Sequence, residues 1–155
     1  MDDKDLTIAT PWGMFNYRVG FLIFENNKVL LQKSTAGFWF LPGGRVAFGE
    51  TSLEAVRREA MEELHTDNAQ FTFAGITENF FVMDNNSFHE LMIFYRVIFA
   101  EKLNVPKEDY KGKAIVSGWF SQDQLLETDL KPSFLKHQVF DFSTGTKHVI
   151  HRDGD

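Results

Sequence analysis

The chain has 155 residues, the length of a single domain that can bury a sizeable core, and we expect one domain spanning residues 1–155. Its content of 43% hydrophobic and 25% charged residues is that of ordinary soluble globular proteins, and the absence of cysteine excludes disulfides, thiolate metal sites and cysteine nucleophiles. The net charge of −6, the lack of an apolar run of membrane-spanning length and a start unlike a signal peptide predict a cytoplasmic protein without membrane or nucleic-acid partners.

Three short strands are predicted in the first quarter of the chain. Residues 19–24 form a continuous apolar run, typical of a strand that is covered on both faces. The polar residues 26–28 predict a turn to a second strand, Val29 to Lys33. Residues 38–41 predict a third short strand, which leads into a sharp Pro-Gly-Gly turn.

A helix follows this glycine turn and begins near Ser52. Thr51 and Glu54 have the spacing of a capping box, which marks a helix start. At about 100° per residue, one arc of this helix carries apolar side chains that would pack into a core. The adjoining arc carries Glu59, Glu62 and Glu63 at positions i, i+3 and i+4. Such like charges repel one another, so the sequence predicts either a solvated acidic face or a site for a hard divalent cation.

The second half of the chain predicts two long strands and shorter elements. The long strands are residues 71–81 and 91–100, joined by a polar turn at 84–87. The shorter elements are a strand at 118–120, a short helix that starts with residues 123–127, a second helix from 132 through about 139, and a small hairpin of residues 139–142 and 147–151. His148 and His151 are three apart in that last strand, so we expect them to point to opposite faces.

The glycine turn and the acidic helix together resemble the signature of the Nudix hydrolases, G-x5-E-x7-R-E-U-x-E-E-x-G-U, in which U is a bulky aliphatic residue. The matching positions are Gly44, Glu50, Arg58, Glu59, Glu62 and Glu63. Three supporting positions depart from the pattern: Ala60, His65 and Thr66. His65 replaces the glycine that ends the helix, where a positive φ is often needed. The resemblance implies an α/β (α+β) fold, a Nudix-like α/β/α sandwich with a mixed β-sheet between helices.

The resemblance also implies a metal site and a reaction. The metal would be Mg²⁺, with Mn²⁺ as a substitute, and the reaction would be attack of water at phosphorus in a nucleoside diphosphate linked to another group. The implied metal-site residues are Gly43 (through its carbonyl), Glu50, Glu59, Glu62 and Glu63. Arg58 would orient Glu59 by a charge-assisted hydrogen bond, with a surface ion pair to Glu62 as the alternative.

Substrate-binding residues and the general base lie outside the signature. Arg45 directly follows the glycine pair, where a basic side chain can contact phosphates; Arg18 and Lys33 are further candidates, and Trp39 offers a face on which a base can stack. Family members often place an acid shortly before a late Trp, but this neighbourhood contains Lys111, Lys113 and Ala114. We therefore predict Glu90, at the mouth of a long strand, as the general base.

The leading hypothesis is a Mg²⁺-dependent pyrophosphohydrolase acting on a small nucleotide derivative. ADP-ribose, nucleotide sugars, dinucleoside polyphosphates and nucleoside triphosphates all remain open as substrates. One alternative is pyrophosphate removal at an RNA 5′ end, which the acidic charge balance does not favour. Another is a non-catalytic nucleotide-sensing module, against which the intact set of acids argues. A homodimer would be consistent with the family.

Overall fold

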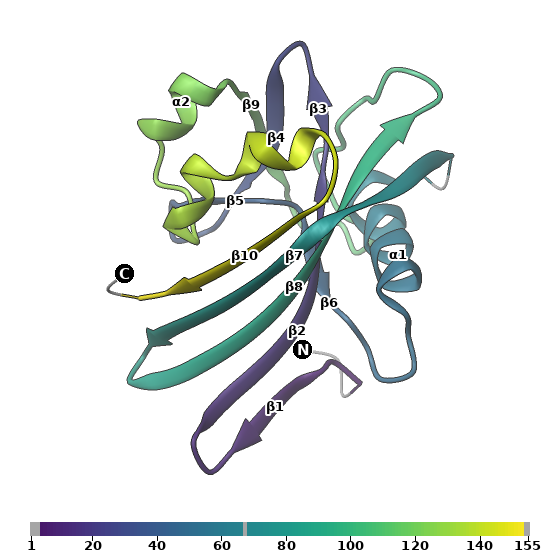
Figure 1. Cartoon of the computed structure of the whole chain (residues 1–155). Helices are drawn as coiled ribbons and strands as arrows, with labels where there is room; N and C mark the ends of the chain where they lie inside the picture. Colours follow the sequence, from purple (N-terminus) through teal and green to yellow (C-terminus); the bar gives the residue numbers. More distant parts are fainter. Residues whose placement is uncertain (1–3, 67, 154–155) are drawn as a thin grey trace.

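The structure, a computed structural model, describes residues 4–66 and 68–153, which form two β-sheets (Figure 1). The larger sheet contains β1 (Thr7–Thr10), β2 (Gly13–Leu22), β6 (Gly43–Arg45), β7 (Ala69–Met83), β8 (Asn86–Phe99) and β10 (Lys147–Arg152). Its order is β1-β2-β8-β7-β10, with β6 also pairing with β2; the pairs β2–β8 and β7–β10 are parallel and the others antiparallel. The smaller sheet contains β3 (Phe24–Glu25), β4 (Lys28–Lys33), β5 (Trp39–Phe40) and β9 (Val116–Phe120).

Helices cover both faces of the larger sheet. The helix α1 (Ser52–Leu64) lies on one side, and α2 (Gln122–Leu126) with the 3₁₀ helices η1 (Ser133–His137) and η2 (Val139–Ser143) lies on the other (Figure 1). This arrangement confirms the predicted mixed sheet between helical layers. Within the described ranges, no helix is long and apolar enough to cross a membrane.

Each face of the larger sheet has its own hydrophobic core. On the α1 side, Phe21 and Leu30 are fully buried in one cluster with Val56 of the helix. On the opposite side, Phe94 of β8 packs against Phe142 of η2, with ring centroids 5.1 Å apart. Because burial of apolar surface is the main stabilising term, the first of these cores fixes where α1 stands relative to β2 and β6.

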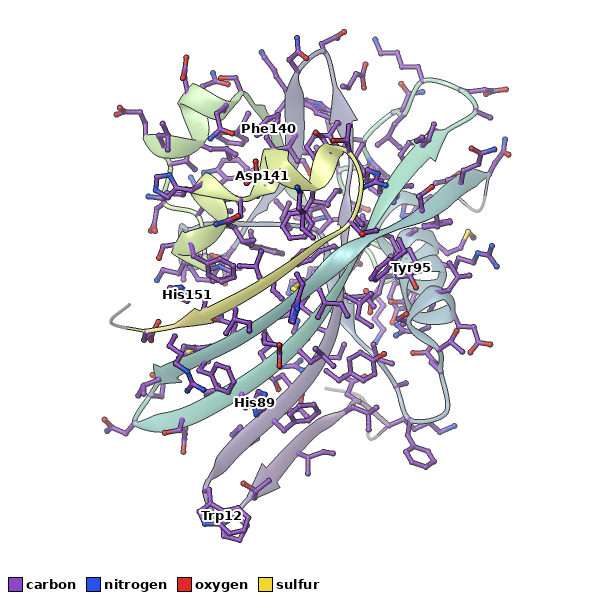
Figure 2. All side chains as sticks on the ribbon, viewed as in Figure 1. Trp12, His89, Tyr95, Phe140, Asp141 and His151 are labelled. Carbon is purple, nitrogen blue, oxygen red and sulfur yellow. The ribbon has the colours of Figure 1, made fainter. Side chains whose placement is uncertain are left out.

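Local interactions hold both ends of α1. The predicted capping box is present: Thr51 Oγ1 accepts a hydrogen bond from Glu54 N (3.1 Å), and Thr51 N donates to the Glu54 carboxylate (3.0 Å). The hydroxyls of Ser52 and Tyr95 are 2.7 Å apart, and Tyr95 projects from β8 toward α1 (Figure 2). At the other end His65 adopts a left-handed conformation with φ of 56°, the conformation that glycine usually supplies.

The predicted strands are present, with different bounds. The strand predicted at residues 19–24 begins at Gly13 and is preceded by β1, which was not predicted. The two long strands extend to a tight turn at Asp84 and Asn85, both with positive φ, so the polar turn is shorter than predicted. The strand predicted at residues 118–120 is the end of β9.

The prediction for the C-terminal segment was wrong in two respects. The second helix is two short 3₁₀ helices, and residues 139–142 belong to η2 and form no hairpin strand. Residues 147–152 pair instead in parallel with β7, about 70 positions earlier in the chain. This pairing needs a glycine at position 75, because a Cβ there would collide with the carbonyl oxygen of Lys147.

Candidate active site

The guanidinium of Arg58 lies among three acids of the signature. Its Nε is 2.8 Å from Glu50 Oε2, and its Nη1 is 2.9 Å from Glu59 Oε1 and 3.4 Å from Glu62 Oε2. Its Nη2 donates to the carbonyl oxygen of Arg45 at 2.9 Å. The structure therefore contains both contacts weighed from the sequence, to Glu59 and to Glu62. It adds two further contacts of Arg58, to the carbonyl of Arg45 in β6 and to Glu50 in the loop before α1.

Glu50 holds the loop before α1. Its Oε1 accepts hydrogen bonds from Arg58 Nη2 (3.0 Å) and from the backbone N–H of Ala47 (2.8 Å), while its Oε2 accepts from Arg58 Nε. These contacts orient Arg58 and fix the loop. The metal-binding role of Glu50 stays a prediction.

Glu63 has a partner that was not predicted from the sequence. Gln32 of β4, only 6% exposed, donates from Nε2 to Glu63 Oε2 at 3.2 Å. A single polar residue inside the buried run Val-Leu-Leu-Gln is a signal that could have pointed to it. A buried amide that holds a carboxylate is the kind of neighbour that orients metal ligands.

The glycine pair makes β6 narrow beside the acids. A Cβ on Gly44 would collide with the carboxylate of Glu59, so glycine leaves the space that Glu59 occupies. Hydrogen bonds between β6 and β2 alternate along the ladder, with Phe21 N donating to Pro42 O and Val46 N to Tyr17 O. The carbonyls of Gly43 and Arg45 therefore point away from β2, on the side where Arg45 O meets Arg58.

Replacing Gly44 by alanine is expected to displace Glu59 and lower kcat about a hundredfold, because small misplacements of a catalytic group have effects of that size. Steady-state kinetics measures the change. Gly49→Ala is the matched control, since Gly49 lies in the loop that follows β6, with a φ of 89°, but has open space around its Cβ position. It should lose stability from backbone strain while keeping kcat. Equal kcat losses in both variants would contradict this account.

The charged forms of Glu59 and Glu63 are disfavoured by burial when no cation is bound. Burial raises the pKa of Glu59 to about 7, although Arg58 opposes the shift. Burial raises the pKa of Glu63 to about 8, the charge of Glu59 adds to the rise, and the hydrogen bond from Gln32 opposes it. In the described ranges, no three acidic or histidine side chains converge as a metal cluster, and the guanidinium of Arg58 lies among the acids. A set of carboxylate oxygens and an adjacent free carbonyl nevertheless fits a hard divalent cation.

The stability of the metal-free protein should fall as pH rises from about 5 to about 8. Glu59 and Glu63 have folded-state pKa values above their ordinary 4.5, so their contribution is fully present below pH 4.5 and is lost as pH passes 7 to 8. The unfolding temperature with chelator should fall by roughly 5 °C over this range. Adding Mg²⁺ should raise the unfolding temperature more at pH 8 than at pH 6. Glu63→Gln should flatten the slope; an unchanged slope would contradict the prediction.

Two arginines, on the paired strands β2 and β6, lie close to the acids of α1. Arg18 and Arg45 are paired residues of β2 and β6, so their side chains share a face. The Nε atom of each is buried without a hydrogen-bond partner. The charge of Arg18 also lowers the pKa values of Glu59 and Glu63, opposing the effect of burial. The structure thus brings two of the predicted substrate-binding residues together beside the acids.

The other two predicted substrate-binding residues contact each other. Lys33 Nζ lies 5.8 Å from the centre of the Trp39 ring, and that ring packs edge-on against Phe120 at 4.8 Å. Lys33 is exposed, whereas Trp39 is half-buried against the core. Their roles in substrate binding stay predictions.

Glu90 lies inside β8, four residues after the strand begins, so its predicted place at the strand mouth was wrong. It is 6% exposed and accepts a hydrogen bond from Asn16 Nδ2 at 3.5 Å. Its role as general base stays a prediction. In β10, His148 pairs with Glu78 at 2.6 Å, and His151 stacks on Phe134 at 4.5 Å.

Comparison with known proteins agrees with this geometry. A family model of the NUDIX domain matches residues 14–140. Among solved structures, the MutT mutator protein of Bacillus halodurans is 20% identical over 88% of this chain and 89% of that chain, with a TM-score of 0.63. An ADP-ribose pyrophosphatase of Streptococcus suis is 19% identical over 88% and 98%, with a TM-score of 0.60. A MutT Nudix hydrolase of Burkholderia pseudomallei is 24% identical over 79% and 95%, with a TM-score of 0.58.

At these identities the solved structures establish the fold, and the family model, which spans most of the chain, establishes the family. The chain belongs to the Nudix family. It is a Nudix hydrolase, an enzyme class that cleaves pyrophosphate bonds and generally uses divalent metal ions. The resemblance carried by Gly44 to Glu63 is thereby confirmed.

Proposed function

We propose that the protein hydrolyses the pyrophosphate bond of a small nucleoside diphosphate derivative, with Mg²⁺ as the cofactor and Mn²⁺ as a substitute. The observation that carries the proposal is that acidic side chains lie on one side of the narrow strand β6 and arginine side chains lie beside it. Glu59, Glu62 and Glu63 lie on its helix side, and Arg18 with Arg45, each with an unpartnered buried Nε, lie beside it. Cation-binding acids next to arginines whose Nε atoms have no partner suit a substrate that carries several phosphate charges.

Each residue has a proposed task in this reaction. Glu59, Glu62, Glu63 and the carbonyl of Gly43 would hold the metal, which supplies charge neutralisation on phosphate oxygens and lowers the pKa of bound water. Arg18 and Arg45 would bind phosphate oxygens through charge-assisted hydrogen bonds. Arg58 orients the acids, and Gln32 holds Glu63 in one rotamer.

A turnover screen tests the proposal. The compounds are ADP-ribose, UDP-glucose, diadenosine polyphosphates and the nucleoside triphosphates, each with Mg²⁺, with Mn²⁺ and with chelator. Products are identified by mass spectrometry, and ¹⁸O-labelled water reports which phosphorus is attacked. We expect metal-dependent release of a nucleoside monophosphate from at least one compound. The absence of turnover with every compound and metal would contradict it.

Two further assays in the same screen address the other readings of the sequence. A 5′-triphosphorylated RNA tests removal of pyrophosphate at an RNA end. Calorimetry with the same nucleotides tests a module that binds without hydrolysis. Sedimentation of the purified protein tests whether it forms a homodimer.

A further inference from the structure

A row of polar residues crosses the larger sheet on the face opposite α1. Strand register aligns one residue from each of five strands: Thr7, Asn16, Glu90, Asn79 and His151, in the order β1-β2-β8-β7-β10. These five residues are called the polar row. His151 at its far end is visible on β10 in Figure 2.

The face of the polar row follows from strand alternation. A Cβ on Gly20 would contact the ring of Phe94, which packs on Phe142 of η2. Side chains two residues apart on a strand lie on the same face, so Asn16 and Arg18 share the face of Gly20. Val19 lies on the opposite face, in the core under α1. The polar row therefore lies on the same face as Arg18 and Arg45, which are proposed to bind phosphate and are called the phosphate-side arginines.

The three central residues of the polar row are buried but incompletely paired. Asn16, Glu90 and Asn79 are 5%, 6% and 3% exposed. Asn16 Nδ2 donates to Glu90 Oε2 at 3.5 Å, whereas Asn16 Oδ1 and Asn79 Oδ1 have no hydrogen-bond partner. A buried acceptor without a donor costs on the order of 1–3 kcal/mol. Two unpaired amide oxygens on either side of a buried carboxylate are expected where a ligand supplies the missing donors, because most buried polar groups are paired.

The polar row lies at the distance of a nucleoside from the phosphate-side arginines. Asn16 and Arg18 are two residues apart on β2, and Glu90 is the register partner of Asn16 on β8. Spacings of about 3.3 Å per residue and about 4.8 Å between strands place Glu90 about 8 Å from Arg18. Phe134 of η1 stacks on His151 and bounds the far end of the row.

We propose that Asn16, Glu90 and Asn79 form the subsite for the nucleoside part of the substrate and accept hydrogen bonds from a pair of adjacent donors on it, a proposal that rests on the function given above. A carboxylate flanked by two amide oxygens selects donors and disfavours acceptors. Two parts of a nucleotide offer adjacent donors: the N1–H and 2-amino edge of guanine, and the 2′- and 3′-hydroxyls of ribose. Glu90 is in this account a binding residue and not the general base.

Calorimetric titration of the wild type and of Glu90→Gln with nucleoside monophosphates tests the proposal without requiring turnover. The probes are GMP, AMP and UMP and their 2′-deoxy forms. Loss of about tenfold in affinity for GMP and dGMP alone identifies the guanine edge. A similar loss for all three ribonucleotides, absent in the 2′-deoxy series, identifies the ribose. Glu78→Gln, a carboxylate on β7 that pairs with His148, is the matched control and should bind like the wild type.

Three results would overturn the subsite. One is affinities of Glu90→Gln within twofold of the wild type for every probe. Another is failure of the wild type to bind any probe at millimolar concentration. The third comes from the substrate found in the turnover screen: a fall in kcat with unchanged KM would assign Glu90 to proton transfer instead. If the wild type binds nucleotides but hydrolyses nothing, the hydrolytic function fails and the subsite stands.

Discussion

Replacing Glu63 by glutamine is expected to lower kcat about a thousandfold while the protein stays folded. Glu63 is half-buried at the end of α1, and its carboxylate is held by Gln32 and repelled by Glu59. Glutamine keeps the size of the side chain but removes the charge that a divalent cation requires. A loss of about 4 kcal/mol of transition-state stabilisation, the scale of metal-ion catalysis, corresponds to that factor. Glu62→Gln should behave alike.

The measurement is steady-state turnover at several Mg²⁺ concentrations, with circular dichroism to confirm the fold. The metal-free Glu63→Gln protein should be at least as stable as the wild type at pH 8, because the substitution removes a buried charge whose pKa is raised. Glu54→Gln is the matched control, since Glu54 lies on the same helix but serves the capping box, which glutamine also completes. Unchanged turnover in both Glu62→Gln and Glu63→Gln would refute the assigned mechanism.

Features that depend on neighbouring residues were predictable from the sequence. The capping box of Thr51 and Glu54, the stacking of Glu59 with Glu62 and Glu63 on one side of α1, and the turn at residues 26–28 all follow from local spacing. The left-handed end of the helix at His65 was also readable, because the family pattern places a glycine there.

Features that depend on pairing between distant segments were not predictable. The parallel pairing of β10 with β7 joins positions about 70 residues apart, and the Ser-Thr-Gly-Thr turn in between imitates a hairpin. For the same reason Gln32 and Asn16 were missed, since their importance comes from Glu63 and Glu90, which reach them only through the fold. Gln32 could have been noticed as a polar residue after three apolar ones in β4, whereas Asn16 has no such signal, because its neighbours in β2 are half-buried and include Arg18.

The placement of Glu90 shows what register adds to sequence reasoning. From the sequence it preceded a predicted strand, at whose mouth it was expected to lie. The longer strand β8 buries it between Asn16 and Asn79. A general base and a nucleoside-binding group both require a carboxylate near the site, so the sequence alone does not distinguish the two roles. The position of that carboxylate relative to Arg18 and α1 does.

Replacing Arg58 by methionine should have two effects, on stability and on turnover. The guanidinium neutralises Glu50, Glu59 and Glu62 together, so its loss leaves partly buried carboxylates without a counter-charge. Because Arg58 is about one-third exposed (34%), solvent screening limits the cost to about 2 kcal/mol of unfolding free energy. Loss of a residue that orients metal ligands should also lower kcat/KM by about 10- to 100-fold.

The dependence on metal distinguishes this role from that of an ordinary surface arginine. Mg²⁺ neutralises the same acids, so adding it should raise the unfolding temperature of Arg58→Met more than that of the wild type. Arg58→Lys keeps the charge but not the planar fork that reaches Glu50 and Glu59 at once, so it should regain stability more fully than turnover. The neighbouring exposed Arg57, which lies over the ring of Phe71, supplies the control variant Arg57→Met. Equal responses of Arg57→Met and Arg58→Met to Mg²⁺ would mean that Arg58 does not organise the acids.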